Sequence, residues 1–440
     1  MRRLCFFLIM LFILCYGYVY SQQLSGGSSA RHIALGGGPI NPYLRDIMRV
    51  HINPAQLAAD SNVVWGDLGY LAVDAPNGGS RHQFLGATVG ITERLQAGLI
   101  LNKRETPLYI VDPSTPALDP ITEMNGYVGS VLGFSSQQFG RPQSPFELVG
   151  AYHGDSSDLG GSISYGSWKN ERSAGGELTQ SVQTFRIKFG VVASRFHRFL
   201  TIDCAVLFGL HTIDGKYTAS GQTNELSMDD GLEYGVDVRT EYSLNDRSIL
   251  VPRLRWYSSS WGMNQVKNGV PAAPNPASTY DHSELEIGVG ANYHMDNVLI
   301  TGGLSFQQTV LRSDYKTGSS SSITTTTITD LPKVNFGAEI RLTSWIVTRI
   351  GYFDRLAATE TTVQSPSGKT TTTVSSELPW YGDPNGLSAA QQRVTVGIGV
   401  NVGGILFDGT IGEGYFLNGP WPLSGTAQEM FGVVSLNVHF

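Results

Sequence analysis

Cysteine is scarce in this chain of 440 residues, which contains three. Two of them lie within the first 21 residues, a segment with the features of an export signal, so the exported chain keeps only Cys204. A single thiol forms no internal disulfide, and it argues against a disulfide scaffold and against a cysteine-based metal site.

Long apolar runs are also missing. After residue 21 no segment approaches the roughly 18 uninterrupted apolar residues that a membrane-spanning helix needs. Because lipid supplies no partners for unpaired backbone groups, such a chain can cross a membrane only as a closed barrel of strands. The composition also argues against disorder, since 41% of the residues are hydrophobic and 19 phenylalanines and 19 tyrosines are present.

Basic charge is not in excess. The formal net charge is −7, and removing Arg2 and Arg3 with the export signal lowers it by two, to −9. An acidic chain is not attracted to the phosphates of nucleic acid, so we expect no nucleic-acid partner.

Catalytic motifs are lacking as well. None of the nine histidines lies in a nucleophile elbow, an H-E-x-x-H motif or another spacing with a mechanism. His211 and His282 fall near the expected outer rim, where a solvated side chain is the simplest interpretation. Asp229-Asp230-Gly231 and Asp112 are too isolated to predict a calcium site. We expect no enzyme activity, no metal and no cofactor.

Residues 1–21 predict a cleaved export signal. Two arginines precede an apolar run from Leu4 to Leu14, and small residues up to Ser21 offer a cleavage site. An uncleaved anchor is the alternative, which the shortness of the run disfavours.

The hairpin from Lys333 to Phe353 shows the pattern that dominates the rest of the chain. Its first limb alternates apolar residues with polar residues or glycine, a tight turn follows at Thr343-Ser344-Trp345, and a second strand returns. Alternation with a period of two predicts a strand with one apolar and one polar face. Such a strand suits a wall with lipid outside and water inside.

Similar hairpins recur along the mature chain. They are expected at 62–73 with 83–91, 95–101, 146–166, 185–210, 232–257, 285–306 and 394–415. Longer connections separate them, at 103–144, 169–183, 213–229, 260–281, 313–328, 357–390 and 417–428. Short turns at one rim and long loops at the other are typical of an outer-membrane barrel, not of a soluble β-sandwich.

Two threonine-rich stretches, 318–330 and 359–376, have high β-propensity and predict hairpins that project beyond the membrane. A disordered Ser/Thr tract is the alternative.

The last strand carries a specific pattern. Val434, Leu436, Val438 and Phe440 share one apolar face, with polar residues between them. A final strand that ends on an aromatic residue resembles the sorting signal read by the outer-membrane insertion machinery, which we therefore expect as a partner.

Residues 22–60 lack strand-like alternation. Their R-H-I-A-L-G-G-G and N-P-A-Q-L-A segments resemble the amino-terminal region of FadL-type outer-membrane barrels, including long-chain fatty-acid transporters and the PorV/PorQ-like branch. The resemblance implies that Asn53, Pro54 and Ala55 belong to a hatch inside the lumen, although Gln56 replaces the commoner glycine. An ordinary Asx-Pro turn is the alternative.

The expected architecture is thus all-β: a signal peptide at 1–21, a luminal hatch at 22–60 and an antiparallel transmembrane β-barrel at 61–440. Direct counting gives about 16 strands, while the family resemblance favours 14, so the range is 14 to 16.

Charged residues on the predicted inner faces are candidates for the site: Arg186, Lys188, Asp203, Glu233, Asp237, Arg239, Glu241, Arg253, Arg255, Glu286, Glu339 and Arg341. Cross-strand pairing is the plain explanation of mixed charge inside a barrel. Contact with a ligand is the alternative, with Arg253, Arg255, Arg341 and Glu339 as candidates.

The family resemblance implies a barrel in the outer membrane of a Gram-negative cell, in contact with its lipids, that binds or passes hydrophobic small molecules such as long-chain fatty acids. The competing function is a PorV-like barrel that transports nothing small and acts as a shuttle or scaffold for secreted or envelope proteins in type IX secretion. A general diffusion porin comes third, because a hatch would obstruct it.

Overall fold

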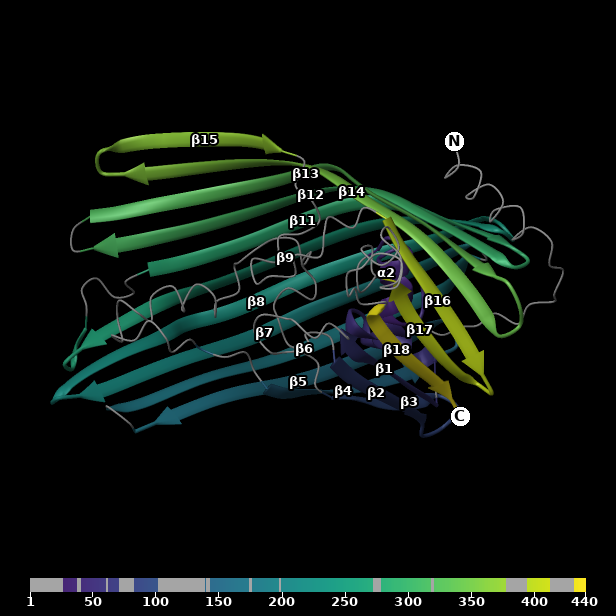
Figure 1. Ribbon diagram of the computed structural model, residues 1–440, viewed down its shortest axis with the longest axis horizontal. Coiled ribbons are helices and arrows are strands. Elements are labelled where there is room, and N and C mark those ends of the chain that lie inside the picture. Colours follow the sequence, from purple (N-terminus) through teal and green to yellow (C-terminus); the bar gives the residue numbers. More distant parts are fainter. Residues whose placement is uncertain are drawn as a thin grey trace, which may run out of the picture.

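The computed structural model describes residues 27–37, 41–60, 62–70, 83–101, 139, 143–173, 176–197, 199–271, 278–317, 320–376, 394–411 and 431–440. They form one curved antiparallel sheet around a short N-terminal segment (Figure 1). No helix among these residues is long and apolar enough to cross a membrane.

The sheet closes on itself. Its strands are β1 (Val63–Tyr70), β2 (Gln83–Gly90), β3 (Leu95–Leu101), β4 (Gln143–His153), β5 (Ser157–Arg172), β6 (Glu177–His197), β7 (Leu200–Ala219), β8 (Gln222–Asn245), β9 (Ser248–Lys267), β10 (Val270–Pro271), β11 (Ser278–Met295), β12 (Val298–Thr317), β13 (Ser320–Arg341), β14 (Ile346–Ser365), β15 (Gly368–Ser376), β16 (Val394–Val402), β17 (Ile405–Ile411) and β18 (Phe431–His439). Antiparallel pairing of β1 with β18 joins the two ends of the barrel.

The ring of the barrel has 16 of the 18 described strands, because β10 is a two-residue strand that pairs back on the end of β9, and β15 is the outer limb of a hairpin on β14. The favoured count of 14 is therefore wrong, and the direct count is correct. Both β4 and β5 are members of the wall, paired from Phe146 to His153, so the hairpin expected at 146–166 is confirmed.

The alternation of faces follows the sequence prediction. On β7, Val206, Phe208 and Leu210 are exposed on the outer face. Asp203 and Ala205, which have the opposite parity along the strand, are buried on the inner face. An apolar outer face and a polar inner face are what a barrel wall in lipid requires.

Aromatic side chains mark the outer band. Tyr234 and Trp256 are exposed neighbours on β8 and β9, with ring centroids 5.3 Å apart. Tyr242, also exposed, lies further along β8, roughly 26 Å of strand away at about 3.3 Å per residue. At the usual strand tilt this distance covers most of an apolar band about 25 Å tall.

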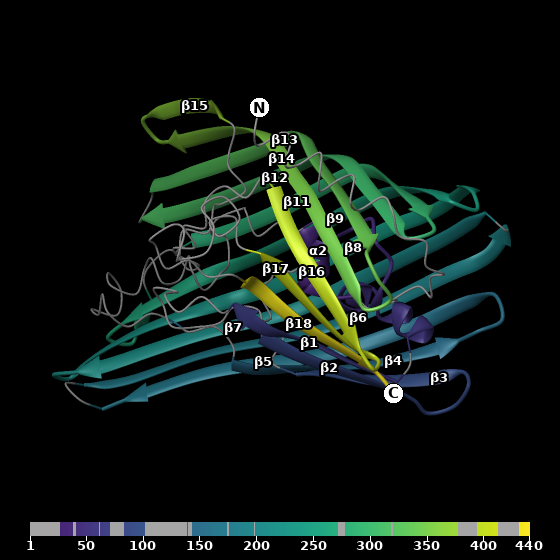
Figure 2. The ribbon, with the colours of Figure 1, turned by 45° about the vertical axis from the view of Figure 1, so that its right-hand side comes forward.

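The wall is unequal in height. Strands β6 to β9 and β11 to β14 have 18 to 24 residues, whereas β1 to β3 and β16 to β18 have 7 to 9. About 9 to 11 residues cross a bilayer, so the long strands project beyond it on the side of the long loops (Figure 2). The threonine-rich stretches form parts of β13, β14 and β15 in this projection, which confirms the predicted hairpins.

The polarity of the wall reverses in the projection, where the inner face becomes apolar. Its buried cluster consists of Phe139, Val182, Ile213, Leu226, Met228, Trp261, Met263 and Tyr280. On β8 a register shift between Asp229 and Leu232 exchanges the two faces, because one extra residue reverses the alternation.

Candidate functional site: the filled lumen

The described part of the N-terminal segment occupies the lumen. It contains α2 (Ser29–Ala34) and the 3-10 helices η1 (Ile47–His51) and η2 (Pro54–Ala59), which Figure 2 draws inside the ring of strands. Its apolar side packs on β1 to β4, where Ile47, Met48, Leu57, Trp65 and Ile100 belong to one buried cluster.

Asn53 begins η2 and also fixes it to the wall. Its side-chain oxygen accepts a hydrogen bond from the Ala55 N–H at 2.9 Å, which caps the helix. Its Nδ2 donates to Asp203 Oδ1 of β7 at 2.5 Å and to the carbonyl of Val191 of β6 at 3.3 Å. One side chain thus starts the helix and positions it on two strands.

Asp203 accepts hydrogen bonds from both polar side chains of the N-P-A-Q motif, Asn53 and Gln56. Its second oxygen accepts from Gln56 Nε2 at 2.7 Å and from Arg49 Nη2 at 3.0 Å. The same Arg49 nitrogen donates to Asp237 at 3.2 Å. Gln56, which stands where the family pattern commonly has glycine, therefore has a hydrogen-bond partner on the wall of this barrel.

Two inward glycines make room for this helix. A Cβ at Gly190 would lie 1.7 Å from Asn53 Oδ1, and one at Gly160 would lie 2.3 Å from the Ala55 nitrogen. No side chain fits at either position, because the Asn53 side chain occupies the space at Gly190 and the backbone of Ala55 occupies that at Gly160.

The Tyr43 ring fits against inward glycines of β11 and β12. A Cβ at Gly290 or Gly303 would lie 2.3 or 2.0 Å from its ring. Its carbonyl accepts hydrogen bonds from Asn292 Nδ2 at 2.8 Å and from Arg239 Nη2 at 3.2 Å. The alternating glycines of β11 and β12 were visible in the sequence, but nothing there indicated what would occupy the space.

The α2 end is held by ion pairs. Ser28 donates to Asp408 at 2.7 Å. Arg31 bridges Asp46 of the segment and Glu339 of β13, each at 2.8 Å. Glu339 also accepts from Arg349 at 2.7 Å. The structure thus places Glu339, a candidate ligand contact, between two arginines.

Two carboxyl groups of the segment have shifted acidities. Burial opposes the charge of Asp46, but the His32 ring, the Arg31 guanidinium and the Met48 N–H outweigh it and hold its pKa at about 2. For Asp60, burial and then the nearby charge of Asp46 raise the pKa to about 6.

The predicted luminal arginines are paired with carboxylates. Arg253 donates to Asp237 at 2.6 Å and to Glu286 at 3.0 Å, and Arg255 pairs with Glu284. Cross-strand pairing is therefore their role in this structure, while ligand contact stays a prediction. Arg341 lies half-buried at the turn end of β13.

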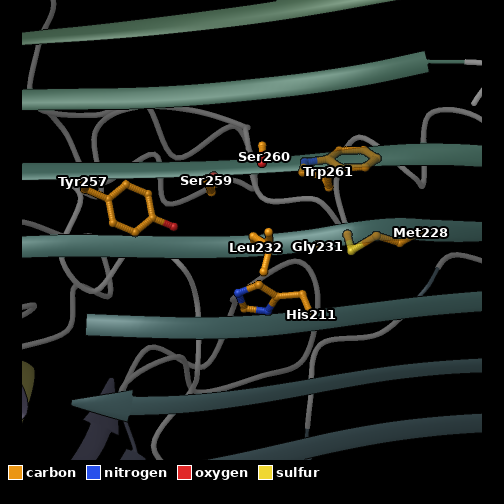
Figure 3. A pocket seen from close by; sticks show the side chains of 8 residues that line it. All are labelled: His211, Met228, Gly231, Leu232, Tyr257, Ser259, Ser260 and Trp261. Carbon is orange, nitrogen blue, oxygen red and sulfur yellow. The ribbon is translucent and has the colours of Figure 1, made fainter. Parts of the chain in front are cut away.

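The two rim histidines are buried, so the expectation of solvated side chains is wrong. His211 lies 3.2 Å from Glu233, and the His282 ring is 5.4 Å from that of Tyr257. β7 continues to Ala219 and β11 begins at Ser278, so both histidines lie within strands of the wall and not at its rim. The small hollow beside His211 and Trp261 (Figure 3) is too closely filled to hold a water molecule.

The final strand is placed as its alternation predicts. Val434, Leu436 and Val438 alternate with buried Ser435 and Asn437. Phe440 is exposed, and its N–H donates to the Asn62 carbonyl at 3.0 Å. The last residue therefore completes the seam, while its role in sorting stays a prediction.

A closed antiparallel barrel with an apolar outer band and paired charges inside has the architecture of a membrane-spanning β-barrel. No family model matches this chain, and no curated protein matches it.

Several solved barrels are similar at low identity. The monoaromatic hydrocarbon channel CymD is 10% identical over 96% of this chain and 99% of its own, with a TM-score of 0.37. The toluene transporter TodX of Pseudomonas putida is 9% identical over 96% and 98%, with a TM-score of 0.36. The ferric yersiniabactin uptake receptor FyuA of Yersinia pestis is 9% identical over 86% and 72%, with a TM-score of 0.38. Similarity this weak supports no conclusion about function. The class of protein, a membrane-spanning β-barrel, is therefore inferred from the geometry of the barrel alone.

Proposed function

We propose that this chain is an outer-membrane barrel in which residues 22–60 act as a hatch, and that it binds or passes hydrophobic small molecules such as long-chain fatty acids. The observation that carries the proposal is the segment in the lumen, fixed to β7 at Asn53 and to β17 at Ser28, on opposite sides of the ring. In this position it obstructs free diffusion, which argues against a general porin.

The nature of the anchors supports a hatch that moves. Hydrogen bonds and ion pairs such as Arg49–Asp203 and Arg31–Glu339 fix the segment to β7 and β13. Polar anchors can exchange their partners for water when the segment shifts, which costs about 1 kcal/mol for a neutral hydrogen bond and more for a buried ion pair. A shift of the segment therefore needs no unfolding of the wall.

The position of the apolar cluster supports a hydrophobic ligand. The cluster around Trp261 and Tyr280 lines the inner face on the loop side of the charged residues. A solute that enters from that side meets this apolar surface before it meets the charges and the segment.

The test compares the full chain with a variant that lacks residues 22–60, in planar bilayers and in liposomes loaded with a fatty-acid sensor. We expect the deletion to raise ion conductance and the full chain to admit fatty acid. Unchanged conductance would contradict the hatch, and absence of fatty-acid entry would contradict the transport function.

The scaffold function has one observation of its own, the tall wall of β6 to β14, which exceeds what transport through a bilayer needs. Mass spectrometry of complexes purified from native membranes in mild detergent separates the two functions. A stoichiometric lipid without a protein partner favours transport, and a stable secreted protein favours the scaffold.

A further inference from the structure

β15, the outer limb of the β14–β15 hairpin, has a free edge in the described part of the chain. β15 pairs with β14 from Ala357 to Ser365, whereas β16 pairs with β14 only from Ile346 to Tyr352. β15 therefore continues the wall beyond the end of β16. Among the described residues no strand pairs with its second edge, and Figures 1 and 2 both place it at the margin of the molecule.

The projecting sheet has a second margin, which is protected differently. Pairing of β4 with β5 reaches only Ser167, so residues 168–172 of β5 form the other edge. That edge carries Lys169, Glu171 and Arg172, charges of the kind that prevent a foreign strand from pairing. In β15 the only charged residue is Lys369, and the strand contains no proline.

The exposed side chains of β15 suit an added strand. Lys369, Thr370, Thr371 and Thr372 are all exposed. Threonine pairs already cross this sheet: Thr362 and Thr371 hydroxyls lie 3.2 Å apart, as do those of Thr326 and Thr361. A strand rich in threonine, serine or valine would extend these rows, because cross-strand pairs of such residues stabilise a sheet.

A second copy of the chain does not fit this edge. Two barrels in one membrane point the same way, so their β15 strands would run in parallel. The two strands of a parallel pair make unlike hydrogen bonds, which a two-fold axis along the strands cannot relate. The geometry therefore favours an unlike chain that arrives in extended form.

We propose that the outer edge of β15 is a docking site for an extended, threonine- or valine-rich segment of a second protein, which pairs with it as an additional strand. Main-chain hydrogen bonds supply the affinity in this mode of recognition, and alternate side chains supply the specificity. The proposal does not depend on what passes through the lumen.

The test uses the full chain in lipid nanodiscs and a fluorescent peptide with the sequence of residues 358–365, ATETTVQS, which is the segment that β15 already pairs with. Binding is measured by fluorescence anisotropy. We expect saturable binding that falls at least tenfold when the fourth residue of the peptide is replaced by proline.

Two neighbouring variants, Thr371→Pro and Thr372→Pro, keep the test falsifiable. Consecutive N–H groups of a strand point to opposite sides, so one substitution disturbs the pairing with β14 and the other blocks only the free edge. Each is expected to abolish peptide binding. The variant whose proline faces the free edge should keep the hairpin folded, as shown by unchanged resistance to proteolysis. Asn170→Pro on the charged β5 edge is the matched control and leaves binding unchanged.

Three results would overturn the proposal. The first is no saturable binding by the full chain, and the second is binding by both proline variants as tight as that of the unchanged chain. The third is a strong gain of binding when residues 377–393 are deleted, which would identify this chain's own segment as the occupant.

Discussion

The side-chain amide of Asn53 lies 2.5 Å from the carboxylate of Asp203, a residue 150 positions further along the chain. The contact joins the segment in the lumen to the wall. Asn53 Nδ2, Gln56 and Arg49 all depend on the same carboxylate, which makes Asp203 the point where the contact between the two parts is most vulnerable.

Asp203→Ala should therefore loosen the segment. The change removes one partner of a buried ion pair, which typically costs about 3 to 5 kcal/mol, and leaves Arg49 with Asp237 as its one ion-pair partner among the described residues. We expect a lower unfolding temperature and faster proteolysis within residues 27–60. The control is Asp155→Asn in an exposed turn, where Asp155 pairs with exposed Arg94 and little change is expected. Equal protection of the segment in both variants would contradict the role given to Asp203.

Gly290→Ala should displace Tyr43, because the added Cβ would lie 2.3 Å from its ring. Overpacking of this kind costs about 1 to 3 kcal/mol, and we expect higher single-channel conductance. Gly302→Ala is the matched control, since its Cβ meets nothing closer than 3.5 Å. Adding Tyr43→Ala to Gly290→Ala should relieve the clash and recover part of the lost stability. If the double variant is no more stable than Gly290→Ala, the clash is not the cause.

Stability should fall as the pH rises from about 4 to 6. The pKa of Asp60 is raised from 3.8 to about 6 in the folded chain, so the folded state holds its proton more tightly than the unfolded one. The contribution is complete below the unfolded pKa and is lost as the pH rises through 6, by at most about 3 kcal/mol.

Asp60→Asn should remove this dependence and make the protein more stable at pH 7. The measurement is the unfolding temperature in detergent between pH 3 and 8. Asp46 acts in a separate window, because its pKa of about 2 gives stability above pH 3.8 that is lost only as the pH falls through 2. A pH profile between 4 and 6 that is identical in the wild type and Asp60→Asn would contradict the assignment.

Phe440→Ala should reduce assembly in the outer membrane. The residue is exposed at the end of β18, so its loss removes little packing inside the barrel. We expect severalfold less folded protein in outer-membrane fractions, with unchanged stability of the part that folds. His439→Ala, also exposed, is the control. Equal assembly of both variants would show that the terminal aromatic residue is not read as a sorting signal.

The sequence predicted the hairpins and their faces well, because alternation and short turns are local properties. The turn after Arg341 and the outward position of Phe336 both follow from it. Bulges are different, since one extra residue near Gly231 exchanges the faces of β8 without a mark in the composition. The inward positions of Leu226 and Met228 were missed for that reason, whereas the cluster residues on the other strands keep the parity of their inward charged neighbours.

The partners of the luminal charges could not be predicted from the sequence either. Alternation placed Asp203 and Arg253 on the inner face, but partners such as Asn53 lie 150 positions away and depend on how the barrel closes. The glycines at 160, 190 and 290 read as weak strand positions until the segment that occupies their space is known.

The unequal lengths of the strands give the barrel a slanted mouth. β8 is 16 residues longer than β1 and 15 longer than β18, a difference of roughly 50 Å of strand. In the described part of the chain, the opening therefore faces along the membrane surface on the side of β16 to β18. A protein embedded beside these strands stands level with the entrance, whereas one beside β8 faces a wall.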